Sequence, residues 1–369
     1  MLKPRNCEVI LNYDCNAKCK FCYHPDSVLN KVEQRMPLEQ AAAALYKGRR
    51  EKCWVAYLIG GEITMRADLP KIVRLARGMG YPYVQVMSNG LKLADPAYAR
   101  ELVEAGANIF RVSVHGPDAK THDSLVGVPG AFRKVMKAFE NLTELGAEIS
   151  VNHALNKQNY KKLKPLLEII SGRFGIEDFN VIFPHYNGMM AARASELKVS
   201  VTQAVPYVRE ALAYLKDSGA EIEDTVLVNF TPCNLPEAVH LMAEWERPTG
   251  ARADEPLFHI DGREDRIHGL KERLCLKNKG CASCVYNKRC MGFEKWYSDL
   301  FGSREFRPVR KAAAPLPLVP SHNRLKRAQE LLKRPTAGST GPGTQNTASR
   351  TPCARLVTRP SRLRKLGAP

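Results

Sequence analysis

Three cysteines lie close together near the start of the chain, directly after a short apolar run. Cys15, Cys19 and Cys22 occupy three of eight consecutive positions in the stretch LNYDCNAKCKFC. Three thiolates can hold a four-iron cluster by three of its corners, which leaves the fourth iron free to bind another molecule. Structural zinc more often uses two CxxC pairs, which this spacing does not form. We therefore predict an iron–sulfur cluster with one open iron.

A second group of cysteines appears late in the chain. Cys281, Cys284 and Cys290 form a CxxCxxxxxC pattern that ends two residues before Gly292. Cys275 and Cys233 lie upstream of it, and either residue can supply a fourth sulfur. A CxxC pair serves a zinc knuckle as readily as an iron–sulfur cluster, so this pattern alone leaves both sites open.

The composition is that of a globular protein. The chain has 369 residues, of which 44% are hydrophobic, enough for one large core or two moderate ones. It contains no window of ~20 apolar residues and no N-terminal signal region, so we expect a cytoplasmic protein that does not enter membranes. In a reducing compartment, eleven cysteines favour metal binding over a disulfide framework.

The net charge of +18 is concentrated at the end of the chain. Residues 303–369 contain 15 of the 56 Lys and Arg and only two of the 38 Asp and Glu, which leaves +5 for the rest. This segment is rich in Pro, Gly and Ser and lacks apolar periodicity, apart from one short helix expected at Asn323–Lys333. We therefore predict that it is disordered and that the globular part is nearly neutral.

Strand-like and helix-like segments alternate over the first half of the chain, which predicts an α/β fold with a parallel sheet. Apolar positions spaced by three and four predict helices that begin near Leu38, Leu69, Phe132 and Leu163. Gly106 and Gly146 stand where such helices end. The six expected strands are Glu8–Asn12, Trp54–Ile59, Tyr83–Ser88, Ile109–Val114, Glu148–Ala154 and Phe179–Pro184.

Polar and glycine-rich turns follow the first four of these strands. They are the cysteine loop, Gly60-Gly61-Glu62, Ser88-Asn89-Gly90 and His115-Gly116-Pro117. Because the carboxyl ends of parallel strands meet at one edge, we expect these turns to surround one active site. A helix over 202–216 and a strand over 226–230 then begin a second region.

The CNAKCKFC segment resembles the cluster loop of the radical S-adenosylmethionine (SAM) superfamily, and so does its place after the first strand. The resemblance covers roughly residues 5–190 and implies a partial (β/α)6 barrel of the TIM type. It also implies a [4Fe-4S] cluster on Cys15, Cys19 and Cys22, whose open iron binds SAM. One electron from such a cluster cleaves SAM to methionine and a 5′-deoxyadenosyl radical, which takes a hydrogen atom from the substrate.

The same resemblance suggests further SAM-binding residues. Phe21 matches the aromatic residue that lies near the adenine, and Gly60, Gly61 and Glu62 match the GGE motif near the amino group of SAM. Ile63 replaces the proline that usually follows this motif. Two polar residues at strand ends are expected to meet the ribose or carboxylate of SAM, namely Asn89 and Ser113. No catalytic acid or base is predicted.

The late cysteines resemble the auxiliary-cluster region, called SPASM or the shorter twitch, that follows the barrel in many of these enzymes. Phe293 and Glu294 stand where the full pattern has another cysteine, so we expect one auxiliary cluster, of the [4Fe-4S] type. Its expected ligands are Cys281, Cys284 and Cys290 together with Cys233, which we favour over Cys275. The predicted divisions are residues 1–200 for the barrel, 201–302 for the auxiliary region and 303–369 for the tail.

The expected function is that of a radical SAM oxidoreductase or maturase acting on a peptide or a small molecule. A flavodoxin- or ferredoxin-type protein is the expected electron donor, and no separate leader-binding domain is expected before the barrel. The alternative is a zinc-containing nucleic-acid-binding protein that uses the basic tail. The tail lacks interleaved aromatic residues for base stacking, so we expect no nucleic-acid partner. Deletion of residues 303–369 is expected to leave the iron content unchanged.

Overall fold

The computed structural model describes residues 5–24, 35–220, 226–243 and 254–317. Nine strands form one sheet in the order β7-β6-β5-β4-β3-β2-β1-β8-β9, in which every neighbouring pair is parallel except β8 and β9. All described residues belong to one compact unit, Met1–Arg334. The strands are β1 Asn6–Ile10, β2 Val55–Ile59, β3 Tyr83–Ser88, β4 Ile109–Ser113, β5 Glu148–Ala154, β6 Phe179–Ile182, β7 Val226–Val228, β8 Pro256–Phe258 and β9 Glu264–Arg266.

The first six strands confirm the predicted α/β fold with a parallel sheet, and each lies within two residues of its predicted bounds. Each strand presents alternate side chains to opposite faces of the sheet. Leu58 and Val112 belong to the apolar core, whereas Tyr57 and Arg111, one position away, lie on the other face and contact each other. The inner face of the sheet therefore carries polar and aromatic side chains.

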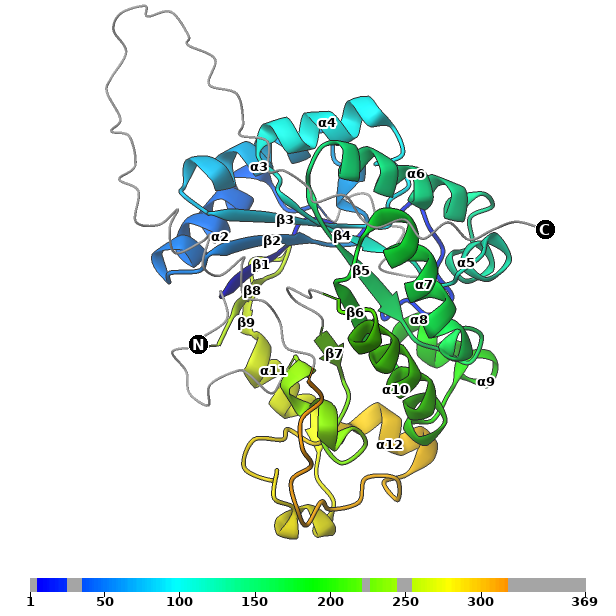
Figure 1. The fold of residues 1–369 in the computed structure, drawn as a ribbon. Coiled ribbons are helices and arrows are strands. Elements are labelled where there is room, and N and C mark those ends of the chain that lie inside the picture. Colours follow the sequence, from blue (N-terminus) through cyan, green and yellow to red (C-terminus); the bar gives the residue numbers. More distant parts are fainter. Residues whose placement is uncertain (1–4, 25–34, 221–225, 244–253, 318–369) are drawn as a thin grey trace, which may run out of the picture. The chain divides into compact units, whose positions relative to one another are not determined.

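Helices cover the outer face of the sheet, as Figure 1 shows for α2, α3, α4, α6 and α7. The predicted amphipathic segments lie in four of these helices, and their apolar positions are buried except for Leu38, Ala42 and Phe132, which are partly buried. Gly106 ends α4 with a φ of +113°, a left-handed conformation that favours glycine. The helices are α2 Leu38–Arg50, α3 Leu69–Gly78, α4 Pro96–Ala105, α5 Ala119–Val126, α6 Ala131–Glu144, α7 Leu163–Phe174, α8 Gly188–Ala192, α9 Ala194–Leu197, α10 Val201–Asp217, α11 Ile267–Leu274 and α12 Lys295–Phe301.

The later part of the chain adds three strands to this sheet. Strand β7 extends it beyond β6, and β8 pairs with β1 at the opposite side, with Glu8 opposite Leu257 and Val9 opposite Phe258. Strands β8 and β9 were not predicted, because three residues are too few to display a period of two. A separate two-stranded sheet, β10 Cys275–Leu276 and β11 Phe293–Glu294, brackets the late cysteines.

The predicted tail begins with residues that pack against the globular part. Phe306 is only 5% exposed, and its ring stacks on that of Phe293 at 4.1 Å between centroids. The division at 302/303 therefore does not mark the end of tertiary contacts. Residues 318–369, including the helix predicted at Asn323–Lys333, lie outside the described residues. No helix among the described residues combines the length and apolar character needed to cross a membrane.

Candidate active site

The loop of Cys15, Cys19 and Cys22 leaves the sheet at the carboxyl end of β1. The amide of Leu11 still donates to the carbonyl of Ile59 in β2, at 2.8 Å, so the loop begins from an ordered edge. Burial raises the pKa of the Cys15 thiol to about 12, and Glu62 and Cys22 add to the shift. Burial likewise raises the pKa of Cys19, and Cys15 and Cys22 raise it further. The three thiols are thus close enough to affect one another.

The backbone of Gly60-Gly61-Glu62 holds this loop in place. The amide of Gly61 donates to the carbonyl of Asn12 at 2.8 Å, and that of Glu62 donates to the carbonyl of Asp14 at 2.9 Å. A Cβ atom on Gly61 would collide with the carbonyl oxygens of Tyr13 and Asp14. Glycine is required here because the end of β2 approaches the cysteine loop itself.

The Glu62 side chain is fully buried and joins the ends of β2 and β3. Its carboxylate accepts hydrogen bonds from the Thr64 amide and hydroxyl, the Ser88 hydroxyl and the Asn89 amide, at 2.6–3.1 Å. Burial raises the pKa of Glu62, and these donors oppose the rise. The Asn89 side chain donates to Asn16 at 2.7 Å, and its Nδ2 lies 4.0 Å from the Cys15 sulfur. Glu62 thereby orients a residue that touches the cysteine loop.

An ion pair that sequence analysis missed closes the base of the loop. Asp14 is 4% exposed and accepts hydrogen bonds from Asn12 and from both Nε and Nη2 of Arg35, the first described residue after the loop. Burial alone would raise the pKa of Asp14, but the hydrogen bonds from Arg35 and Asn12 outweigh burial and lower the pKa. The amide of Met36 then donates to the carbonyl of Leu11 at 2.8 Å. No periodicity marks this pair; its only signal is an acid directly before Cys15.

Phe21 and Ser113 occupy two different surfaces near the loop. The Phe21 ring packs edge-on against His115, with the centroids 4.4 Å apart. Ser113 ends β4, lies opposite Asn152 of β5 and is half-buried. The structure thus links Cys15, Asn89 and Glu62 by direct contacts, and the Cys22 amide donates to the Cys19 carbonyl at 3.2 Å. Phe21 packs against His115 instead, and Ser113 lies at the end of β4.

His115 is one of three buried histidines that lie close together. His115 and His122 stack 6.0 Å apart, and His153 lies 5.9 Å from His115. The Nδ1 of His153 donates to the carbonyl of Val114 at 2.8 Å. Burial lowers the pKa of His122 and of His153 to about 4, so both are uncharged at neutral pH.

The late cysteines gather from separate segments. Burial raises the pKa of Cys233, which follows β7, and Cys281 and Cys284 add to the rise. Burial raises the pKa of Cys290 to about 11, with further contributions from Cys233 and Cys281. Cys233, Cys281, Cys284 and Cys290 therefore form one group of thiols. Thr231, Gly292 and Val309 place hydrogen-bonding groups 3.2–3.4 Å from the sulfurs of Cys233, Cys290 and Cys284 respectively.

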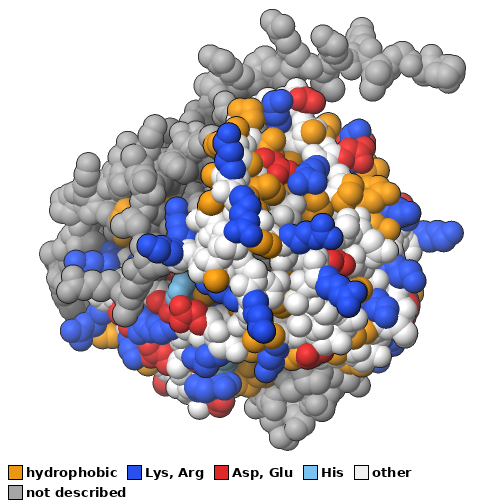
Figure 2. All heavy atoms as spheres, turned by 90° about the horizontal axis from the view of Figure 1, so that it is seen from below, with side chains coloured by type: hydrophobic (Ala, Val, Ile, Leu, Met, Phe, Trp, Pro, Cys, Tyr) orange, Lys and Arg blue, Asp and Glu red, His pale blue; other side chains and the backbone are white. Residues whose placement is uncertain are grey.

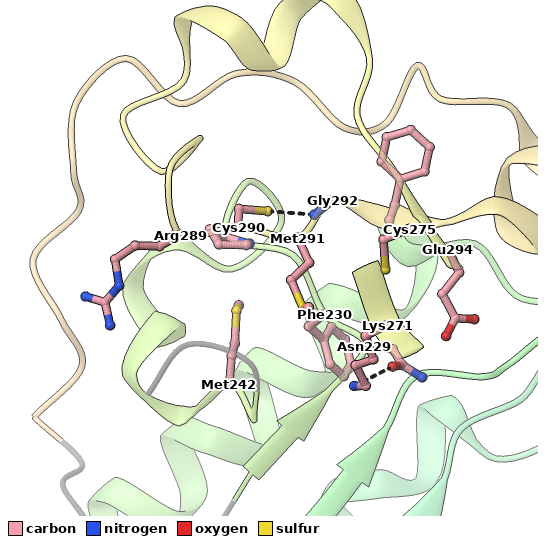
Figure 3. Close-up of a pocket in the computed structure, with 12 residues that line it drawn as sticks. Asn229, Phe230, Met242, Lys271, Cys275, Arg289, Cys290, Met291, Gly292 and Glu294 are labelled. Atoms are coloured by element: carbon pink, nitrogen blue, oxygen red, sulfur yellow. Dashed lines mark hydrogen bonds between the residues drawn. The ribbon is translucent and has the colours of Figure 1, made fainter. Parts of the chain in front are cut away.

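Cys275 lies at the edge of this group and lines a pocket (Figure 3). Burial raises its pKa to about 11, and the neighbours that act on it are Glu294, Lys271 and then Cys290. The Lys271 ammonium donates to Asn229 at 3.3 Å. The Asn229 amide contacts His185 Nε2 at 2.9 Å, and His185 Nδ1 lies 2.6 Å from Glu294. Sequence analysis missed this polar network, which has no local motif.

Both groups of thiols have the donor chemistry of an iron–sulfur site, because cysteine sulfurs hold such clusters and nearby hydrogen-bond donors stabilise them. Within the described ranges, no three His, Cys, Asp or Glu side chains converge closely enough to enclose a single metal ion. The fit of each group therefore rests on its thiols and the donors around them.

Comparison with known proteins finds similarity in the part of the chain that holds the early cysteines. Residues 9–170 match the model of the Radical SAM superfamily. The AdoMet-dependent heme synthase of Oleidesulfovibrio alaskensis is 30% identical over 155 residues, which are 42% of this chain and 39% of that protein. A probable GTP 3′,8-cyclase of Saccharolobus islandicus is 28% identical over 186 residues, 49% of this chain and 57% of that protein. The chain thus matches less than two thirds of the length of either relative.

The fold extends further than the sequence similarity. The structure of Streptococcus suis SuiB bound to its precursor peptide SuiA superposes with a TM-score of 0.62 at 16% identity, covering 83% of this chain and 75% of that chain. At this identity the likeness establishes a shared fold.

Proposed function

We propose that this chain, which carries a radical SAM domain over residues 9–170, cleaves SAM reductively and uses the resulting radical to remove hydrogen from a peptide or a small molecule. In this proposal Cys15, Cys19 and Cys22 hold the [4Fe-4S] cluster. Such a cluster supplies one electron to SAM, which releases methionine and a 5′-deoxyadenosyl radical.

The observation that carries the proposal is the attachment of the cysteine loop. Three mutually interacting thiols follow β1, and the backbones of Gly61 and Glu62 fix the residues just before them. The Asn89 side chain reaches the first cysteine from the end of β3. A rigid support of this kind holds a bound cofactor at one edge of the sheet, where parallel α/β sheets place their chemistry.

Other residues near the loop have roles in binding SAM. In this proposal Phe21 lies beside the adenine, and Ser113 and Asn89 bind the ribose or carboxylate. The backbone of Gly60 and Gly61 faces the amino group. The carboxylate of Glu62 already accepts four hydrogen bonds from the chain, so its role is to position Asn89 and not to bind SAM directly.

We assign one auxiliary [4Fe-4S] cluster to Cys233, Cys281, Cys284 and Cys290. Both Cys281 and Cys284 raise the pKa of Cys233, whereas Cys290 is the one late cysteine among the causes of the raised pKa of Cys275, and this difference supports Cys233 as the fourth ligand. A bound auxiliary cluster can accept an electron from a substrate radical or relay one to the first cluster. A flavodoxin- or ferredoxin-type protein is the proposed electron donor.

The substrate is proposed to lie between the two cysteine groups. Tyr23, which follows Cys22, is 45% exposed and its ring lies 6.3 Å from that of His185. His185 belongs to the polar network of Asn229, Lys271 and Glu294 beside the late cysteines. This row of side chains connects the two sites and offers both charged and aromatic contacts to a peptide or a small molecule.

An anaerobic assay with dithionite tests this function. The purified protein should be brown, hold about eight irons per chain and form 5′-deoxyadenosine from SAM. Cys19→Ala should abolish this cleavage, whereas Cys284→Ala should retain it but stop conversion of substrate. Colourless protein with stoichiometric zinc would contradict the proposal. Mass spectrometry of candidate peptides and small molecules incubated with the enzyme then identifies the substrate class.

No observation favours the zinc-containing nucleic-acid-binding alternative. Figure 2 shows Lys and Arg side chains dispersed among acidic and apolar ones on the face in view, which differs from a continuous basic surface.

A further inference from the structure

The first residues of the basic tail cover the late cysteine group. We define the covering segment as Ser303–Arg310. The Asn278 side chain donates to the carbonyls of Ser303 and Phe306, at 3.3 and 2.8 Å. The Glu305 carboxylate accepts from the Tyr297 hydroxyl at 2.7 Å and from the Thr202 amide at 3.1 Å.

The covering segment ends with a direct contact to a cysteine. The amide of Val309 donates to the sulfur of Cys284 at 3.4 Å, and the carbonyl of Val309 accepts from the Val285 amide at 2.9 Å. Arg310 then donates to the carbonyl of Ser283 at 3.4 Å. Three consecutive residues around Cys284 are thus held by a segment more than twenty residues farther along the chain.

This geometry has an electrostatic consequence for a thiolate at position 284. An N–H group that points at a metal-bound sulfur stabilises negative charge on the cluster. The reduced cluster carries one more negative charge than the oxidised cluster, so the bond favours reduction. The Gly292 amide donates a hydrogen bond of the same kind to the Cys290 sulfur, at 3.3 Å (Figure 3).

From these contacts we propose that the covering segment is part of the auxiliary site and that the Val309 amide raises the reduction potential of the auxiliary cluster. Val309 is a positioning residue, since it acts through Cys284. The inference rests on the proposed auxiliary cluster. It replaces the expectation that the whole of residues 303–369 can be removed without loss of iron.

Paired substitutions at one position test the hydrogen bond. Val309→Pro removes the amide donor, whereas Val309→Ala keeps it and shortens the side chain. A redox titration followed by electron paramagnetic resonance should show a more negative midpoint potential for the late cluster in Val309→Pro and an unchanged one in Val309→Ala. The early cluster provides the internal reference, and its potential should be the same in both variants.

Two truncations test the covering segment. A chain that ends at Pro317 should keep about eight irons, whereas a chain that ends at Gly302 should lose about four. An unchanged early-cluster spectrum and SAM cleavage in the shorter chain show that the barrel has folded. Equal late-cluster potentials in Val309→Pro and Val309→Ala, or a full late-cluster signal in the Gly302 chain, would overturn the inference. A full-length protein without a late-cluster signal would refute the auxiliary part of the proposed function and this inference together.

Discussion

The two cysteine groups are assembled in different ways. The early group comes from one loop of eight residues, fixed by the ends of neighbouring parallel strands. The late group draws on Cys233 after β7, on two adjacent turns, and on a backbone donor at Val309. The first arrangement is local in sequence, whereas the second depends on segments that only the tertiary structure brings together. The early site should therefore be sensitive to its strand-end supports, and the late site to distant chain segments.

The largest expected effect is at the support of the early loop. Gly61→Ala places a Cβ against two carbonyl oxygens, a distortion of about 3 kcal/mol or more that we expect to reduce SAM cleavage by ~100-fold. Iron analysis should show the early cluster depleted and the late one retained. Gly78→Ala is the matched control, because nothing lies within 4 Å of its Cβ position. Full activity of Gly61→Ala would show that the close approach does not support the loop.

The next effect distinguishes the two candidates for the fourth late ligand. Cys233→Ala should lose about four irons and retain SAM cleavage, because its thiol belongs to the group of four. Cys275→Ala should keep both clusters, since after burial the largest effects on the pKa of that thiol come from Glu294 and Lys271 and not from the other cysteines. Iron content and Mössbauer spectra measure both outcomes. The reverse result would exchange the roles of the two cysteines.

A smaller effect is expected at the link between β2 and β3. Glu62→Gln replaces one acceptor oxygen by an NH2 group, which then faces hydrogen-bond donors from Thr64, Ser88 or Asn89. We expect the loss of hydrogen bonds to cost about 1–3 kcal/mol. We expect a drop of about tenfold to a hundredfold in the rate of SAM cleavage, with the late-cluster spectrum unchanged. The exposed Glu104→Gln, on α4, serves as the control. Equal rates in the two variants would remove Glu62 from the supports of the loop.

The smallest effect at neutral pH is that of two buried histidines, which alter the stability of the protein only as the pH falls. Histidines in the unfolded chain take up protons near pH 6.5, whereas burial holds the pKa of His122 and His153 at about 4. The unfolded state therefore binds more protons between these values, and stability falls as the pH drops from 6.5 towards 4. At pH 5 the loss is roughly 2 kcal/mol for each histidine.

Thermal unfolding of the metal-free protein at pH 7.5 and pH 5 measures this loss. His153→Gln should show a weaker dependence on pH than the unmodified chain. An identical dependence in both would mean that His153 does not contribute. Because these histidines lie behind Phe21, acid should weaken the early site more than the late one.

The local patterns in the sequence predict the first six strands, their covering helices and the early cysteine loop. Each of these features depends on neighbours within a few residues, as the spacing of Cys15, Cys19 and Cys22 illustrates. The contact of Arg35 with Asp14 and that of Val309 with Cys284 could not be predicted, because they join separate segments without a motif. Strand β8 escaped prediction for a related reason, since its partner β1 lies about 249 residues earlier in the chain.

The pairing of β1 with both β2 and β8 has a consequence for how the protein folds while it is being synthesised. The first strand finds one neighbour early but remains open on its other side until residues 256–258 leave the ribosome. At 5–20 residues per second this interval lasts roughly 10–50 s. Throughout it, the strand that precedes the first cysteines exposes unpaired backbone groups to any other chain nearby. Rapid synthesis, or a chaperone that covers the open edge of β1, should raise the yield of active protein.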